Sequence, residues 1–156
     1  MKIGRVTLSD RASAGIYEDL SGPEIERVVR ECLDPGGEFV VRLLPDDRNQ
    51  IESTLRELAD LEECELIITT GGTGPSARDV TPEATRAVLD RELPGFGEVM
   101  RAVSFKNVPT AILSRATAGT RGRTLIVNLP GNPRAINVCL PPIVPAIREC
   151  LLHLRQ

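Results

Sequence analysis

The stretch TTGGTGPSARDVTPEAT, from Thr69 to Thr85, decides the fold predicted for this chain. It overlaps the end of ELIITT (Glu65–Thr70), whose continuous apolar character is typical of a β-strand covered on both faces. A loop with three glycines follows, and Thr81 and Pro82 are typical of a helix start, with Thr81 as the N-cap. The order strand, glycine loop, helix predicts one unit of an α/β sheet.

The chain before this stretch alternates strands and helices in the same way. Lys2–Leu8 and Glu38–Leu44 are rich in β-branched and apolar residues and predict two strands. Ser21 opens a capping box for the helix between them, and Asp47 is the predicted N-cap of the next helix. Such alternation predicts an α/β fold with a parallel sheet, helices on both faces and right-handed crossovers.

The chain after this stretch predicts further elements. A helix is expected at residues 94–105, entered through Pro94, and strands are expected at Pro109–Ser114 and Thr124–Leu129. The connection between these strands is short, which favours an antiparallel hairpin. A turn and one or two closing helices follow Leu129.

Composition narrows the class of protein. With 156 residues and 41% hydrophobic residues, the chain suits one domain spanning 1–156. A net charge of -3 and a pI near 5.3 disfavour nucleic acid as a partner. The N-terminal segment has no pattern of a secretory leader, and we expect the prolines of the apolar stretch Ala135–Ile147 to leave it too short to cross a bilayer. We therefore expect a cytoplasmic protein with no membrane contact.

The cysteines and the histidine exclude several kinds of site. The four cysteines form no close pair, so we expect buried thiols and no zinc or redox centre at Cys32, Cys64, Cys139 and Cys150. His153 is the only histidine and lies in a leucine-rich segment, where a packed or half-exposed ring is expected. Most Ser-His-Asp and Cys-His schemes are thereby excluded.

Four predicted loops should meet at the carboxyl edge of the sheet, where ligands of such sheets bind. They are rich in glycine, hydroxyl residues and aspartate, which suit anions, metal ions and ribose. These loops are residues 9–20, 45–47, 71–81 and 129–133.

Gly71, Gly72, Thr73 and Gly74 form the loop GGTG, whose backbone N–H groups can turn toward a phosphate. The loop matches neither a Walker A motif nor the dinucleotide fingerprint, and a tight strand-to-helix turn is the structural alternative. A carboxylate beside a phosphate would be repelled unless a cation lies between them. Asp79 therefore indicates Mg²⁺ or a sugar hydroxyl at this loop.

Other polar residues are candidates for the binding site, but each also has an ordinary structural explanation. Asp46 lies where the chain leaves the second strand, and it is either a site residue or a solvated turn acid. Ser9 and Asp10 belong to SDRASAG, which is either part of the site or a polar loop. Three arginines are either solvated hairpin charges or ligands of an anionic substrate: Arg115, Arg121 and Arg123.

These motifs together closely resemble the molybdopterin adenylyltransferases, the MogA/MoaB-like enzymes of molybdenum cofactor biosynthesis, a family that includes a domain of gephyrin. The resemblance spans nearly the whole chain in the same order. The motif at 69–85 is long and specific, whereas LPGNP also occurs in the molybdenum-insertion (MoeA-like) domains. The other matching segments are SDRASAGIYEDLSG, LLPDD, PGFGEVMR and AILSRATAG.

The resemblance implies a three-layer α-β-α fold around a mixed, mostly parallel sheet, and a homotrimer. It implies transfer of AMP from Mg-ATP to the terminal phosphate of molybdopterin, with release of pyrophosphate. Asp46 and Asp79 match aspartates required for activity, and we expect both to hold Mg²⁺. The GGTG loop matches part of the substrate site, and the resemblance places four further residues around the pterin and phosphate: Ser114, Asn128, Pro130 and Gly131.

Two rival functions keep the same fold. A carrier or scaffold would bind molybdopterin without adenylylating it, and would not need two metal carboxylates. A regulatory module would bind ATP or GTP without dependence on the pterin. A MoeA-like insertion protein is a further partner expected from the resemblance.

Overall fold

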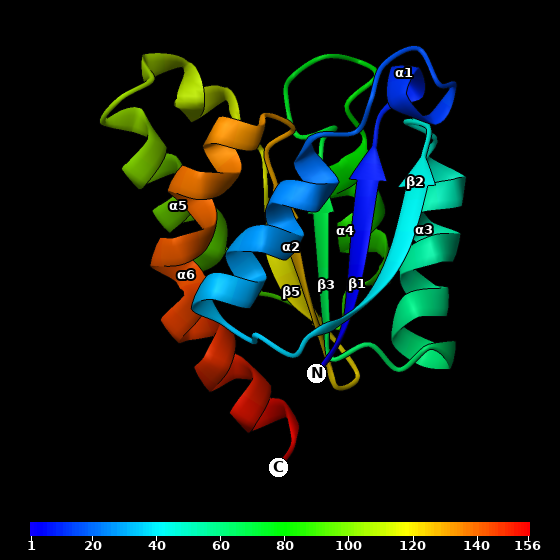
Figure 1. The fold of residues 1–156 in the computed structure, drawn as a ribbon, viewed down its shortest axis with the longest axis vertical. Helices are drawn as coiled ribbons and strands as arrows, with labels where there is room; N and C mark the ends of the chain where they lie inside the picture. The colour runs from blue at the N-terminus through cyan, green and yellow to red at the C-terminus, as the bar shows by residue number, and fades with distance from the viewer.

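A six-stranded sheet of order β2-β1-β3-β6-β5-β4 forms the centre of the structure, a computed structural model of residues 1–156 (Figure 1). The strands are β1 (Lys2–Leu8), β2 (Glu38–Leu44), β3 (Leu66–Thr70), β4 (Arg91–Glu92), β5 (Ala118–Arg121) and β6 (Thr124–Leu129). The helices are α1 (Asp10–Ser13), α2 (Ser21–Cys32), α3 (Arg48–Arg56), η1 (Glu57–Leu61), α4 (Thr81–Val88), α5 (Gly95–Phe105), η2 (Pro109–Leu113) and α6 (Pro133–Leu154).

The sheet is mixed and mostly parallel, as expected. β2, β1, β3 and β6 run parallel, so their carboxyl ends lie at the same edge. β5 pairs antiparallel with β6, and β4 pairs antiparallel with β5. β5 and β6 form an antiparallel hairpin, but its first strand is not the expected Pro109–Ser114.

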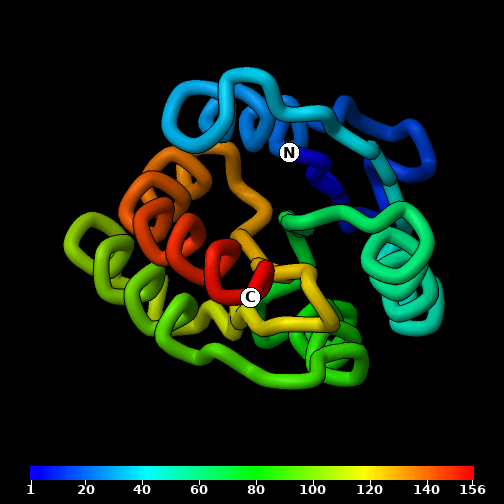
Figure 2. The backbone as a smooth tube through the Cα atoms, turned by 90° about the horizontal axis from the view of Figure 1, so that it is seen from below, coloured from blue at the N-terminus to red at the C-terminus, as the bar shows by residue number.

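Two hydrophobic cores make the fold three-layered. Successive residues of a strand point to opposite faces, so Ile68 packs in one core and Ile67 in the other, and both are fully buried. The first core includes residues of α2, α5 and α6, and the second includes residues of α3 and α4. Figure 2 shows these two groups of helices on opposite sides of the sheet.

The prediction of a strand at Pro109–Ser114 was wrong, because this segment contains the 3-10 helix η2. The side chains of Ile112 and Leu113 are 65% and 52% exposed, so they do not provide the buried face of a strand. The strand β5 comes later and pairs with β6. Its small, weakly apolar residues gave a poor strand signal, and tertiary pairing decided the outcome.

Two of the three predicted helix caps differ from expectation. Asp47 caps α3 as predicted, accepting a hydrogen bond of 2.9 Å from the Gln50 N–H. Ser21 and Thr81 are instead the first residues of α2 and α4. Their hydroxyls donate to the carbonyls of Gly131 (2.7 Å) and Gly71 (2.9 Å). Both hydroxyls thus tie a helix start to a loop at the carboxyl edge of the sheet.

Of the one or two closing helices expected, the structure has one, α6, which is continuous over 22 residues with Pro141, Pro142 and Pro145 inside it. By length and composition it could cross a membrane, so the expectation that this stretch is too short was wrong. Its buried residues, among them Ile143 and Ile147, belong to the first core. Packing against the sheet, α2 and α5 compensates for the backbone hydrogen bonds that proline removes.

The thiols and the histidine lie away from the carboxylates of the loops. Cys64 and Cys139 are buried as expected, whereas Cys32 and Cys150 are partly exposed, and all four are free. His153 lies on the last turn of α6, where its ring faces Glu149 at 3.0 Å and remains exposed to solvent.

Candidate active site at the carboxyl edge of the sheet

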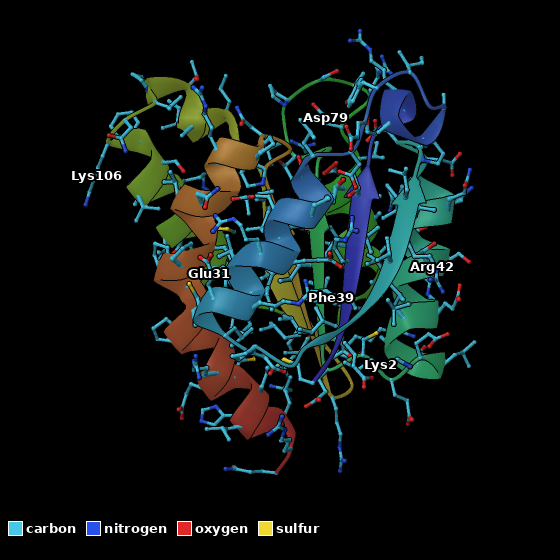
Figure 3. The ribbon with its side chains drawn as sticks, viewed as in Figure 1. Lys2, Glu31, Phe39, Arg42, Asp79 and Lys106 are labelled. Atoms are coloured by element: carbon cyan, nitrogen blue, oxygen red, sulfur yellow. The ribbon has the colours of Figure 1, made fainter.

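The four predicted loops meet at the carboxyl edge of the parallel strands. The Asp46 N–H donates to the Asp10 carboxylate at 2.8 Å, which joins the loops after β2 and β1. The Thr70 hydroxyl donates to the Pro130 carbonyl at 2.7 Å, which joins the loops after β3 and β6. Figure 3 shows Asp79 at the same end of the molecule as these loops, and Lys2 near the opposite end.

Two glycines of the GGTG loop have backbone conformations that other residues rarely adopt. Gly71 has φ of 99° and Gly72 has φ of 66°. A Cβ atom at Gly71 would lie 2.3 Å from the Leu8 carbonyl oxygen, and one at Gly72 would lie 2.3 Å from the Thr81 hydroxyl. Glycine is therefore required at both positions for the loop to pass between β1 and α4.

The GGTG loop presents three successive N–H groups without an acceptor in the protein, those of Gly72, Thr73 and Gly74. The N–H of Gly71 instead donates to the Leu129 carbonyl at 3.2 Å. The expectation that Gly71 binds phosphate through its N–H was therefore wrong, because pairing with the end of β6 uses that donor. The three following donors form a segment suited to an anion.

Arg115 fixes the shape of this loop. Its guanidinium donates to the carbonyls of Gly74 and Asp79, each at 2.8 Å, and forms an ion pair with Glu83 of α4. Its backbone N–H also donates to the Thr73 carbonyl at 2.7 Å. Arg115 is therefore neither a solvated hairpin charge nor a residue free to bind a substrate, because its guanidinium binds backbone carbonyls of the loop. Only the match of AILSRATAG to the family could have drawn attention to it.

Asp46 is the most unusual carboxylate of the site. Its Oδ1 atom is buried without a hydrogen-bond partner, and its Oδ2 atom accepts from the Asp10 N–H at 3.3 Å. Burial raises the pKa of Asp46 above its ordinary value of 3.8, and the charges of Asp10 and Asp79 act in the same direction. A Cβ at Gly72 would lie 3.2 Å from Oδ1, so this oxygen faces the GGTG loop. A buried carboxylate oxygen without a partner is a suitable ligand for a cation.

Asp79 and Asp10 flank Asp46. One oxygen of Asp79 accepts from the Ser76 N–H at 3.1 Å, and a Cβ at Gly74 would lie 2.8 Å from the same oxygen. The pKa of Asp10 is lowered, chiefly by a hydrogen bond from the Arg78 guanidinium. Three carboxylates of different loops therefore line one cavity of about 270 Å³.

The carboxylates of this cavity suit Mg²⁺ better than they suit a metal ion whose ligands all come from the protein. No group of three or more His, Cys, Asp or Glu side chains is close enough to hold a metal ion by itself. Mg²⁺ typically takes one or two carboxylates and completes its coordination with water and substrate phosphates. The buried Oδ1 of Asp46 and the neighbouring carboxylate of Asp79 meet that requirement beside the free N–H groups of the loop.

Three cavities lie at the carboxyl edge of the sheet, and two of them are lined by residues of the GGTG loop. The cavity with the carboxylates is lined by Asp46 and Asp79. A second cavity, of about 350 Å³, shares Asp46 with it and adds Gly71 and Gly72. A third, of about 480 Å³, lies against α5, η2 and α6 and is lined by Thr73, Gly74 and Ser114. We call the first the carboxylate cavity, the second the Asp46 cavity and the third the Ser114 cavity.

Most of the remaining predicted residues line these cavities. Ser9 lines the carboxylate and Asp46 cavities, and its hydroxyl lies 2.8 Å from the Tyr17 hydroxyl. Ser114 and Pro130 line the Ser114 cavity, and Gly131 lines the Asp46 cavity. Sequence reasoning missed Tyr17, whose position in SDRASAGIYEDLSG was its only signal.

Asn128 is the exception, because it does not line any of these cavities. It is fully buried, and its amide nitrogen donates to the hydroxyls of Thr69 (3.1 Å) and Thr85 (3.0 Å). Its amide oxygen accepts from the Thr117 N–H at 3.3 Å. The expected place of Asn128 around the pterin and phosphate was therefore wrong for direct contact; the residue holds β3, β6, α4 and the segment before β5 together behind the site.

Arg121 and Arg123 also lie away from the site, at the turn between β5 and β6 and hence at the opposite edge of the sheet. Arg121 binds the Asp60 carboxylate and donates to the Val88 carbonyl at 2.9 Å. Neither arginine is available to a substrate at the GGTG loop.

The site belongs to a class that the fold and its groups define: a mostly parallel α/β sheet whose edge, with free N–H groups and adjacent carboxylates, suits phosphorylated ligands. Residues 4–149 match the family described as "Probable molybdopterin binding domain". The chain is 53% identical over 149 residues to the molybdopterin adenylyltransferase of Helicobacter pylori, which covers 96% of this chain and 85% of that protein. It is 49% identical over 153 residues to the molybdopterin adenylyltransferase of Escherichia coli, with 98% and 78% covered.

Solved structures agree with these relatives. The molybdopterin biosynthesis enzyme MoaB of Thermus thermophilus is 42% identical and superposes with a TM-score of 0.89, covering 98% of this chain and 95% of that one. The chain therefore belongs to the molybdopterin adenylyltransferases, the MogA/MoaB-like family of nucleotidyltransferases in molybdenum cofactor biosynthesis.

Proposed function

We propose that this enzyme transfers AMP from ATP to the terminal phosphate of molybdopterin, with release of pyrophosphate and with Mg²⁺ as the cofactor. Membership of the family supports the reaction class. The observation that carries the proposal is the position of the buried, unpartnered Oδ1 of Asp46 beside the free N–H groups of Gly72, Thr73 and Gly74. Phosphate and a divalent cation are the pair of ligands that both features accept.

The proposed reaction needs no nucleophile from the enzyme. A terminal phosphate oxygen of molybdopterin attacks the α-phosphorus of ATP, the new P–O bond forms, and the bond to the pyrophosphate oxygen breaks. The N–H groups of Gly72, Thr73 and Gly74 bind phosphate oxygens, and Arg115 keeps the loop in shape. Mg²⁺, held by Asp46 and Asp79, supplies neutralisation of charge on the phosphates. The absence of a histidine triad agrees with this chemistry.

The three cavities suggest where each substrate binds. The Ser114 cavity is lined by Ser104 and Ser114 and by apolar residues such as Val108 and Val138, which suits a flat, polar heterocycle. The Asp46 and carboxylate cavities, which share Asp46, suit the nucleotide and its metal. The two phosphates that react would then meet at the GGTG loop.

The family relationship disfavours the rival carrier or scaffold, and so does a second carboxylate at the site. We propose to measure pyrophosphate release from ATP and Mg²⁺ with and without molybdopterin. Release that depends on the pterin supports adenylyl transfer. Nucleotide binding without release would support a regulatory module, and pterin binding without release would support a carrier; either result would refute the proposal.

A pair of variants sharpens this test. Asp79→Asn removes one metal carboxylate and should reduce turnover by orders of magnitude without unfolding the protein. Asp47→Asn is the matched control, because Asp47 is exposed and asparagine also caps a helix. Near-native turnover of Asp79→Asn would refute the role of this carboxylate.

We further propose that the enzyme is a cytoplasmic homotrimer that passes its product to a MoeA-like insertion protein. Exposed apolar side chains on α5, η2 and the segment between them support self-association: Phe105, Val108, Ile112 and Leu113 are each more than half exposed in the single chain. Light scattering checks the oligomeric state, and a monomer at working concentration would contradict it.

A further inference from the structure

Tyr17 is the only aromatic residue that lines any of the three cavities. The chain contains one tyrosine, three phenylalanines and no tryptophan. Tyr17 lines both the Asp46 cavity and the carboxylate cavity, and it is 52% exposed. Its ring is therefore accessible from the two cavities that suit the nucleotide.

The loop that carries Tyr17 is fixed from both ends. On one side, the Ile16 N–H donates to the Arg11 carbonyl at 2.9 Å. On the other side, the Asp19 carboxylate accepts from the Thr7 hydroxyl at 2.7 Å and from the Arg5 guanidinium at 3.1 Å. Thr7 and Arg5 are buried residues of β1, so Asp19 joins the loop to the centre of the sheet.

The ring itself is also held before a ligand binds. The hydroxyls of Tyr17 and Ser9 lie 2.8 Å apart, and the Ser9 hydroxyl also accepts from the Ala12 N–H at 3.1 Å. A ring held at its hydroxyl end loses little conformational freedom when a planar group stacks on it. Such a ring is pre-organised for stacking.

The distribution of polar groups decides which part of a nucleotide reaches Tyr17. Phosphates are expected at the N–H groups of Gly72 to Gly74 and at the metal carboxylates, as proposed above. Apart from Tyr17, the apolar lining of the Asp46 cavity is aliphatic or proline, as at Leu8, Leu20 and Pro133. Tyr17 thus provides the only π-face in this cavity, and its cavity borders the phosphate site at Gly72.

We propose that Tyr17 is the stacking surface for the adenine base of ATP and so determines affinity for the nucleotide. This inference rests on the proposed function, which requires an adenine nucleotide at this edge of the sheet. Stacking of a base on an aromatic side chain depends on the π-face and not on a specific hydrogen bond. Tyr17→Phe should retain it, and Tyr17→Ala should lose it.

The first experiment uses Tyr17 itself as the probe. Because the chain has no tryptophan and no second tyrosine, tyrosine fluorescence reports on Tyr17 alone. Titration with ATP should quench this fluorescence, whereas inorganic triphosphate, which has the phosphates but no base, should leave it nearly unchanged. Absence of quenching at ATP concentrations shown by calorimetry to saturate the wild type would overturn the proposal.

The second experiment measures binding by calorimetry in three variants. Tyr17→Ala should weaken ATP binding about tenfold, within the range measured for loss of base stacking, and should leave the affinity for inorganic triphosphate unchanged. Tyr17→Phe should bind ATP within about twofold of the wild type. Ile16→Ala is the matched control, because Ile16 is 71% exposed on the same loop and does not line any of the three cavities.

The outcomes separate this inference from the proposed function. Equal ATP affinity of Tyr17→Ala and the wild type would overturn the inference even if pyrophosphate is released. A parallel loss of ATP and triphosphate binding would also overturn it, because it would show that Tyr17 only holds the loop. Quenching by ATP without molybdopterin-dependent release of pyrophosphate would refute the proposed function and leave Tyr17 as a base-binding residue.

Discussion

Arg115→Ala is the substitution that tests how the GGTG loop is held. In the wild type, the Arg115 guanidinium donates to the Gly74 and Asp79 carbonyls, each at 2.8 Å, and pairs with Glu83. Alanine removes all three interactions but no atom of the proposed phosphate and metal site. The loop keeps its glycines, its free N–H groups and Asp79. Any loss of activity would therefore come from the shape of the loop.

The magnitude follows from the charged hydrogen bonds. Each hydrogen bond from a charged donor contributes about 1.5–3 kcal/mol. The Arg115 side chain is 36% exposed, and solvent weakens such bonds, so we take about 2–3 kcal/mol for the bonds to Gly74 and Asp79 together. If this free energy holds the loop in its reactive shape, its loss should reduce kcat/KM by roughly 30- to 150-fold. Arg115→Lys should recover only part of this loss, because one ammonium cannot reproduce the planar fork of the guanidinium.

The assay is pyrophosphate release as a function of ATP and molybdopterin concentration, with the midpoint of thermal unfolding measured in parallel. Arg123→Ala is the matched control, because Arg123 lies at the opposite edge of the sheet. A kcat/KM for Arg115→Ala within about threefold of the wild type would refute the positioning role. So would equal losses in Arg115→Ala and Arg123→Ala.

Three further predictions concern charge and backbone conformation. Asp46→Asn should abolish measurable turnover but leave the unfolding free energy at neutral pH equal to that of the wild type or higher. Burial raises the pKa of Asp46, which means that its negative charge is unfavourable in the folded protein. A less stable variant in chemical denaturation would contradict this. Gly71→Ala should destabilise the protein by more than Gly15→Ala in the same measurement, because both glycines have positive φ but a Cβ meets a backbone oxygen at 2.3 Å only at Gly71. The hydrogen bond from Arg115 lowers the pKa of Glu83 below its ordinary value of 4.5. The stabilisation by this pair is therefore full above pH 4.5 and is lost as the pH falls through the lowered pKa. The difference in unfolding free energy between the wild type and Arg115→Ala should shrink over that range, and a difference independent of pH would contradict the prediction.

The parallel part of the fold was predictable because its signals are local. The runs at Lys2–Leu8 and Glu65–Thr70 are buried on both faces, and Asp47 caps its helix through a contact three residues away. The β5 strand was not predictable in the same way, since Ala118–Arg121 becomes a strand only by pairing with β6. Ser21 and Thr81 look like caps in sequence, yet their hydroxyls bind loops that come from distant parts of the chain.

The residue types of the site were predictable, but their pairings were not. Asp46 and Asp79 were identified from their place after strands and from the family resemblance, and the structure places both at one cavity. The use of the Gly71 N–H by the Leu129 carbonyl and the burial of Asn128 are long-range pairings that no sequence spacing encodes. The role of Arg115 was missed for the same reason, because the carbonyls that it binds belong to a loop some 40 residues earlier in the chain.

The GGTG loop contributes residues to two different cavities, Gly71 and Gly72 to one and Thr73 and Gly74 to the other. Gly71 and Gly72 have no room for a side chain, so substitution cannot reshape that part of the loop in small steps. A change of substrate in either cavity must therefore be made at the outer walls. Tyr17 and Leu20 are available for this in one cavity, and Ser104 and Val108 in the other. On the proposed assignment of the two substrates to the two cavities, preference for one substrate could evolve almost independently of the other.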